Sequence, residues 1–241
     1  MEYTIGSYEI GDLSAELLVP SGMPTSGETA DLNVRLFGKE PQRRIAELAL
    51  TLAVRYRTEN GYERERIARQ TLGEDLSIDA GLRTTHGTSI HVPHALPSTL
   101  GPAELLGEIE FDTDQVVVER EEILALQPTK QFLMVIESVV QLGFVLGDVE
   151  YRADRSPGGE PFVHVLEFRP ADERRQGQVD ELELFVRGGR DGTTLFAAVD
   201  REEEFTVPPA DDSTTVDPGM KSDFDGIYDR VRDLVEPRIG G

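Results

Sequence analysis

Three of the four histidines lie close together, at positions 86, 91 and 94, and imidazole is the commonest side-chain ligand of metal ions. His86 and His91 point to opposite faces of a strand, because side chains alternate along it. Pro93 favours a bend directly before His94. We therefore expect surface and turn histidines, no metal site and no cofactor, while the sequence alone leaves open whether His86, His91 and His94 bind a metal ion.

Acidic residues are so frequent that a single pair of them carries little information about chemistry. Asp112 with Asp114, and Asp211 with Asp212, lack the spacing and the turn glycine of a calcium-binding EF-hand loop. The chain has no cysteine, no phosphate-binding glycine loop and no nucleophile elbow. We expect a protein that is not an enzyme. The alternative is a ligand-binding β-sandwich, for carbohydrate or metal, or an enzyme whose site is built from dispersed acids.

A group of arginines forms a local basic island on this acidic chain. Guanidinium groups bind carboxylates through two parallel hydrogen bonds, so the island could recognise an acidic segment of a partner protein. Equally, the arginines could pair across a hairpin with Glu59, Glu63 and Glu65. The candidate partner-binding residues are Arg55, Arg57, Arg64, Arg66 and Arg69.

The charge of the whole chain restricts its partners. Forty-six acidic residues against 24 Lys and Arg give a net charge of −22, and lysine occurs only at positions 39, 130 and 221. Nucleic acid and anionic membranes bind clustered basic residues, so we expect neither as a partner. A dense carboxylate surface stays soluble where salt screens its charges, so the composition indicates a halophilic protein of a salt-rich cytosol.

The sequence also bears on location. Its first ten residues, MEYTIGSYEI, have neither the basic nor the apolar region of a secretory signal. No stretch approaches the roughly 18 consecutive apolar residues of a membrane-spanning helix. We expect a cytoplasmic protein without an integral membrane segment, whose partners are other proteins; a homo-oligomer is compatible with the sequence.

The first half of the chain has the period of two that is typical of strands. Apolar residues alternate with polar ones at 32–36 and 48–56, and Asn60-Gly61 favours a tight turn with residues 62–71 as the returning strand. No helical pattern interrupts this half, which therefore predicts a β-sandwich. The other expected strands are 13–19, 76–78, 89–92, 104–111, 116–119 and 123–126.

The period changes after Pro128. Thr129 is a suitable N-cap for an amphipathic helix whose apolar stripe we expect to pack on its own sheet, and Gly143 is suited to end that helix. Ser222 and Asp225 resemble the capping box of a final helix. The strands expected between these helices are 145–151, 162–169, 179–187 and 195–199.

Several segments together resemble the sporulation-control protein family. They are RYRTENGY at 55–62, LGF at 142–144, EYR at 150–152, PFVHVLEFRP at 161–170, VDELEL at 179–184 and VDR at 199–201. The scarcity of lysine fits a haloarchaeal-type member of this family. Because the family has no motif of catalytic or ligand residues, the resemblance adds no site residue.

The resemblance implies an arrestin-like fold and a non-enzymatic regulatory scaffold that binds protein partners. We expect a mainly β chain with two arrestin-like β-sandwich domains in tandem, at residues 1–126 and 127–241. The second domain should carry helices near 129–143 and 222–236. With four or five strands, it is short for a full sandwich.

Overall fold

The computed structural model describes residues 2–239 except 40–42, 59–60, 97, 99, 102, 114–116, 154–161, 172–178 and 200–212. The chain divides into two compact units, which are described separately. Unit 1 comprises residues 1–93 and 103–127, and unit 2 comprises residues 94–102 and 128–241. Residues 94–102 belong to unit 2 because the Ser98 carbonyl accepts a hydrogen bond from the Tyr151 hydroxyl and the backbone of His94 lies against Gly188.

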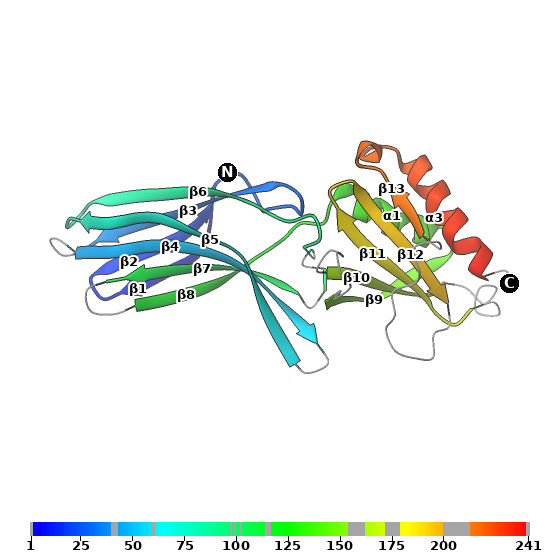
Figure 1. The fold of residues 1–241 in the computed structure, drawn as a ribbon, viewed down its shortest axis with the longest axis horizontal. Helices are drawn as coiled ribbons and strands as arrows, with labels where there is room; N and C mark the ends of the chain where they lie inside the picture. The colour runs from blue at the N-terminus through cyan, green and yellow to red at the C-terminus, as the bar shows by residue number, and fades with distance from the viewer. Residues whose placement is uncertain are drawn as a thin grey trace. The chain divides into compact units, whose positions relative to one another are not determined.

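Unit 1 consists of two four-stranded antiparallel sheets (Figure 1). The first sheet has the strand order β1-β2-β3-β6, with β1 Tyr3–Ile10, β2 Leu13–Val19, β3 Thr29–Gly38 and β6 Arg83–His91. The second has the order β5-β4-β7-β8, with β4 Arg43–Thr58, β5 Gly61–Ile78, β7 Glu104–Asp112 and β8 Val117–Leu124.

The core of unit 1 follows from the alternation in the sequence. Leu13, Ala15, Leu32, Val34 and Leu36 are at most 1% exposed, as expected for the inner face of a sandwich. Gly107 lies where a Cβ atom would approach Leu17 and Leu124 to 3.0 and 3.1 Å, so it allows the two sheets to pack closely.

The expected hairpin is present, with Thr58 paired to Gly61; part of the expected turn lies outside the described residues. Its returning strand is longer than expected, because β5 includes the segment expected as a separate strand at 76–78.

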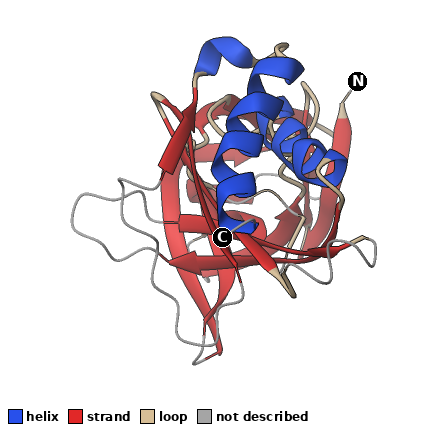
Figure 2. Cartoon of the chain, turned by 90° about the vertical axis from the view of Figure 1, so that its right-hand side faces the viewer, coloured by secondary structure: helices blue, strands red, loops and turns tan. Residues whose placement is uncertain are grey.

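Unit 2 contains a five-stranded antiparallel sheet with the order β13-β12-β11-β10-β9. The strands are β9 Phe144–Ala153, β10 Phe162–Pro170, β11 Leu182–Gly189, β12 Gly192–Val199 and β13 Ser213–Val216. The helices α1 Lys130–Gln141 and α3 Phe224–Ile239 lie side by side (Figure 2), and α3 also contacts β12 and β13. A short 3₁₀ helix, η2 Pro218–Met220, precedes α3.

The two helices agree with the sequence, apart from one cap. Thr129 caps α1, since its side chain accepts a hydrogen bond from the Phe132 amide at 3.1 Å. The predicted cap of the last helix at Ser222 is wrong by one residue, because the Asp223 carboxylate accepts the bond from the Gly226 amide at 3.0 Å. Asp223 is the N-cap because α3 begins at Phe224 and capping oxygens reach the third amide of a helix.

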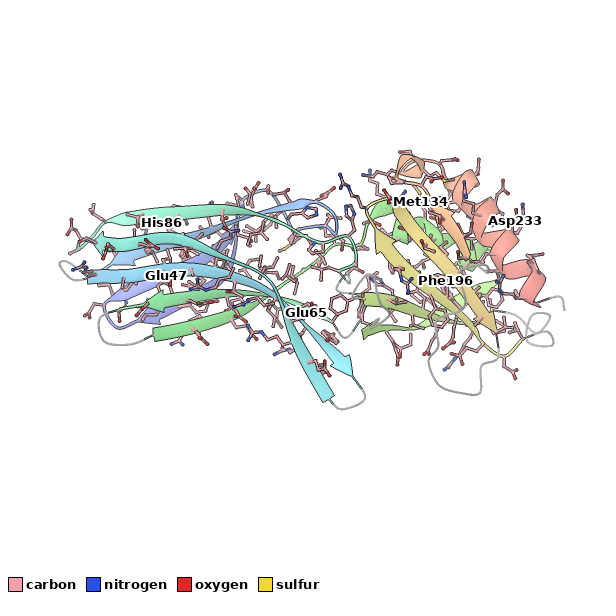
Figure 3. The ribbon with its side chains drawn as sticks, viewed as in Figure 1. Glu47, Glu65, His86, Met134, Phe196 and Asp233 are labelled. Atoms are coloured by element: carbon pink, nitrogen blue, oxygen red, sulfur yellow. The ribbon has the colours of Figure 1, made fainter. Side chains whose placement is uncertain are left out.

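The sheet of unit 2 buries apolar residues on both faces. Phe162, Leu166 and Phe168 point to the face that contacts α1, and the opposite face carries a buried cluster of Val163, Val165, Phe185 and Phe196. Figure 3 labels Phe196 on β12 and Met134 on α1. The expected mainly β chain with two helices in its second half is confirmed. Within the described part of the chain, no helix is long and apolar enough to cross a membrane.

Candidate functional site

Four of the arginines singled out in the sequence, Arg55, Arg64, Arg66 and Arg69, lie on the outer face of the β4–β5 sheet in unit 1. The middle of this face is made by Ala49, Thr51 and Ala53 of β4, which are at most 2% exposed. Such small residues become buried when long charged side chains from neighbouring strands lie over them. The face is therefore covered by arginines and glutamates whose alkyl stems pack on β4.

Arg69 of β5 is the centre of one charged group. Its guanidinium donates to Glu47 on β4 at 3.1 and 3.2 Å and to Glu110 on β7 at 3.0 Å. Thr51 donates its hydroxyl to the other oxygen of Glu110 at 2.7 Å. Figure 3 labels Glu47 on β4. The four side chains form one continuous hydrogen-bonded network across three strands.

These contacts set the protonation of the network. Hydrogen bonds from Arg69, and then from Thr71, lower the pKa of Glu47 below its ordinary value. Burial alone would raise the pKa of Glu110, but the hydrogen bonds from Arg69 and Thr51 outweigh it, and the pKa is lowered. The hydrogen bonds that Arg69 donates to Glu47 and then to Glu110 raise the pKa of Arg69. All the charged members are therefore ionised at neutral pH.

Two further arginines are paired on the same face. Arg55 donates to Glu104 of β7 at 2.6 Å and lies 3.4 Å from Glu121 of β8. Arg64 forms an ion pair with Glu108 of β7. Each of these arginines therefore has a carboxylate partner on a neighbouring strand, and the face carries charges of both signs.

The remaining candidates differ from these three. Arg66 of β5 is exposed and is paired with Ala53 of β4. It has no ion pair within the residues that the structure describes. The side chain of Arg57 lies outside the described residues. Pairing with Glu59, Glu63 and Glu65 is the alternative that the sequence offers. The partners of Arg55, Arg64 and Arg69 come from β4, β7 and β8, which only the fold brings alongside, and Glu59 lies outside the described residues. Whether any of the five arginines binds a partner protein stays a prediction.

The clustered histidines do not share one strand. His86 and His91 lie on β6, opposite Val34 and Thr29, whereas His94 belongs to unit 2. Figure 3 labels His86. Among the residues outside the gaps given above, no group of three His, Cys, Asp or Glu side chains is arranged to hold a metal ion.

The fourth histidine, His164 on β10, is a buried residue that the sequence reasoning missed. Its ring lies 4.9 Å from that of Phe132 on α1 and 4.7 Å from that of Tyr151 on β9. Its Nδ1 lies 3.3 Å from the Val186 carbonyl, which can only accept, so Nδ1 donates. Burial lowers the pKa of His164 to about 4. A neutral imidazole thus joins α1 to the sheet. The alternation in FVHVLEF, which puts His164 on the face of Phe162 and Leu166, was the available signal.

One edge strand of the unit 2 sheet is β9, which within the described part of the chain pairs with β10. Along its other side the Val149 amide donates to the Asp148 carboxylate at 2.8 Å and Gly101 lies against the Val149 carbonyl, so the exposed stretch of this edge is Val145–Asp148. Val145 and Leu146 are 49% and 37% exposed there. Leu146 pairs with Phe168, which lies on the helix side of the sheet, so the Leu146 side chain points to that side.

One flank of α1 adds exposed apolar surface. Gln131 donates a hydrogen bond at 2.6 Å to the carbonyl of Asp217, the residue directly after β13. The flank of α1 that carries Gln131 therefore faces β13, at the edge of the sheet opposite to β9. At 100° per residue, Ile136 and Val140 lie about 140° and 180° around the helix from Gln131, toward β9. Leu133 and Val140 are 47% and 46% exposed. We call Leu133, Ile136, Val140 and Leu146 the apolar shelf.

The other side of the same edge is acidic. Asp148 of β9 is paired with Glu167 of β10, and Glu150 lies further along on the same face. Burial, followed by the charges of Glu181, Glu150 and Asp148, raises the pKa of Glu167. We call Asp148, Glu150, Glu167 and Glu181 the acidic row. The β9 edge thus has an apolar side and a negatively charged side.

One comparison with known proteins gives a family, and another gives a fold. A family model described as SpoOM protein matches residues 4–203. The crystal structure of Spo0M, the sporulation control protein of Bacillus subtilis, superposes with a TM-score of 0.76 at 18% sequence identity, covering 95% of this chain and 100% of that one. The C-terminal domain of wzt gives a TM-score of only 0.31 at 14% identity, covering 52% of this chain and 78% of that one. No match is found among curated proteins.

Proposed function

The chain belongs to the SpoOM protein family of sporulation control proteins, and on that premise we propose that it is a non-enzymatic, cytoplasmic scaffold that regulates by binding protein partners. The expected family and its arrestin-like, mainly β fold are confirmed. The haloarchaeal type stays a prediction.

The observation that carries this proposal is the β9 edge. An open strand edge beside exposed apolar side chains is a surface that an extended segment of another protein can join by β-augmentation. The apolar shelf and Val145 place such side chains on both faces of this edge. A small number of exposed apolar residues needs no explanation when they are scattered, but Val145 and Leu146 are neighbours on the exposed stretch of an edge strand.

The charged face of unit 1 is a less suitable binding surface than the β9 edge, because its arginines are already paired. Arg55, Arg64 and Arg69 are occupied by Glu47, Glu104, Glu108, Glu110 and Glu121. A ligand would have to displace these ion pairs before it could use the guanidinium groups. Binding at the strand edge requires no such displacement, and main-chain hydrogen bonds with apolar contacts keep their strength at high ionic strength.

Capture of partners from native lysate tests the proposal. The tagged full-length chain is incubated in lysate at molar KCl and retained proteins are quantified, with an unrelated protein of similar net charge as control. We expect at least one protein that is enriched over the control and that forms a complex of defined stoichiometry when both components are purified. If no retained protein reconstitutes such a complex, the scaffold proposal is wrong.

A further inference from the structure

Strand β6 lies at one edge of the first sheet of unit 1 (Figure 1). We propose that this edge pairs with the same edge of a second copy of the chain, antiparallel about a twofold axis at Gly87, so that two four-stranded sheets become one. This inference goes beyond the proposed function, because it concerns self-association and holds whether or not the chain binds other proteins.

Alternate main-chain groups of β6 point away from its neighbour β3. The Val92 amide, one position beyond β6, donates to the Glu28 carbonyl at 2.9 Å and continues the register of the β3–β6 ladder. In an antiparallel ladder, the main-chain groups of successive residues point to opposite sides. Since the amide of Val92 points to the β3 side, the amides and carbonyls of Thr85, Gly87 and Ser89 point to the outer side.

These outward groups form an open edge in the described part of the chain. There β6 pairs with β3 alone, and no backbone hydrogen bond outside that ladder reaches residues 83–89. Arg83, Thr85, Gly87 and Ser89 are each exposed. An exposed strand edge with unpaired amides and carbonyls is a template for a further strand.

Charge favours a second copy as that strand. Residues 80–103 are the longest stretch without Asp or Glu in a chain that has 46 acidic residues. The other edge strands of unit 1 carry acids, with Glu9 on β1, Glu63 on β5 and Glu121 on β8. Like charges opposed across strands destabilise their pairing. Of these four edges, β6 is therefore the one at which two chains of net charge −22 can meet without opposed carboxylates.

A twofold axis at Gly87 also matches the side chains on the outer face. Gly87 is the midpoint of β6 Arg83–His91, so the two strands pair along their whole length. Thr85 would lie beside Ser89 of the second copy, and hydroxyl side chains opposed in this way hydrogen-bond across strands. The Ser89 hydroxyl donates to Asp31 at 2.7 Å, which leaves its oxygen able to accept from Thr85.

The inner face of β6 gains a partner in the same arrangement. His86 is paired with the buried Val34 of β3, and its Nε2 has no hydrogen-bond partner among the described residues. The twofold axis would place Thr88 of the second copy directly opposite His86 on the same face, where side chains lie about 5 Å apart. A hydroxyl would thus stand beside an imidazole that lacks a partner within its own chain.

Cysteine cross-linking tests the interface and its register, since the chain has no cysteine of its own. Thr85→Cys and Ser89→Cys are made as separate variants. Opposed residues that exchange hydrogen bonds have Cα atoms about 5.5 Å apart, within the range of a disulfide. Two copies of the same cysteine would lie about 14 Å apart. On oxidation in molar KCl, an equimolar mixture should give disulfide-linked dimers, and either variant alone should give at least about tenfold fewer.

Analytical ultracentrifugation measures the association itself. We expect twice the chain mass of 26.7 kDa in molar KCl, and weaker association in moderate KCl, where the net charge is less screened. Thr85→Pro removes one edge amide per copy at a position where an edge strand tolerates proline, and it should weaken association by about tenfold or more. The control Thr85→Val keeps that amide and should weaken association by about threefold at most.

Several outcomes would overturn the inference. They are a monomer at every concentration up to the solubility limit in molar KCl, equal cross-linking by the mixture and by single variants, and equal association of Thr85→Pro and Thr85→Val. Circular dichroism checks that each variant is folded, and the cross-linking still decides if the proline variant is not. A monomeric chain that captures a partner from lysate would uphold the scaffold function and remove the β6 interface.

Discussion

Lowering the pH from 7.5 to 5 should destabilise unit 2 by about 2 kcal/mol through His164 alone. Burial lowers the pKa of this imidazole to about 4, whereas in the unfolded chain it is about 6.5. Between these values the unfolded state binds more protons than the folded state. The stability is thus fully present above pH 6.5 and falls as the pH decreases toward 4, where the loss reaches about 3 kcal/mol.

The physical cause is the environment of the ring. Protonation would place a cation between the rings of Phe132 and Tyr151, with the Val186 carbonyl as the one acceptor that the described residues offer it. Tyr151 gives no compensating charge, because burial raises its pKa above the ordinary value and keeps the phenol neutral. Charging His164 should therefore loosen α1 from the sheet.

The assay is urea unfolding followed by circular dichroism at several pH values, for the wild type and for His164→Leu. The variant loses the hydrogen bond to Val186 but keeps an apolar side chain of similar size. Other groups titrate in both proteins, so the difference between the two pH profiles isolates His164. The histidine resonance in NMR spectra gives its pKa independently. Parallel pH profiles for the two proteins, or a measured pKa near 6.5, would refute the reasoning.

Four further predictions concern the surface charge, unit 1 and its arginines. If the acidic surface is an adaptation to salt, thermal unfolding should occur at a markedly higher temperature in molar than in low KCl; indifference to salt would contradict the halophilic interpretation. Thr51→Val should destabilise unit 1 by about 1 kcal/mol in urea unfolding, because the buried hydroxyl donates to Glu110 at 2.7 Å. The control Thr71→Val removes an exposed hydrogen bond and should have little effect in the same titration. Gly107→Ala should destabilise by about 1 kcal/mol through overpacking against Leu17 and Leu124, with Gly219→Ala, which meets open space, as the neutral control in thermal unfolding. Replacing Arg55, Arg57 and Arg66 together by alanine tests the arginines as a partner site, and an unchanged set of proteins captured from lysate would remove them.

Much of the fold could be predicted from local patterns. The alternation at 32–36 and 48–56 predicts β3 and β4, and the helical spacing after Thr129 predicts α1 with its N-cap. These predictions hold because the faces of a strand or helix depend on residues a few positions apart. The shift of the last cap from Ser222 to Asp223 shows the limit, since two neighbouring residues were both able to cap.

The candidate sites depended on contacts between distant segments. The sequence alone determined the family, the mainly β character and the dense negative charge, because these follow from composition, period and motif. Only the tertiary structure decided that Arg69 pairs with Glu110, that His164 is buried, and that β9 is an edge strand that contacts α1. The physical reason is that strand order is chosen by the packing of the whole unit, and no local pattern records which strand remains without a neighbour.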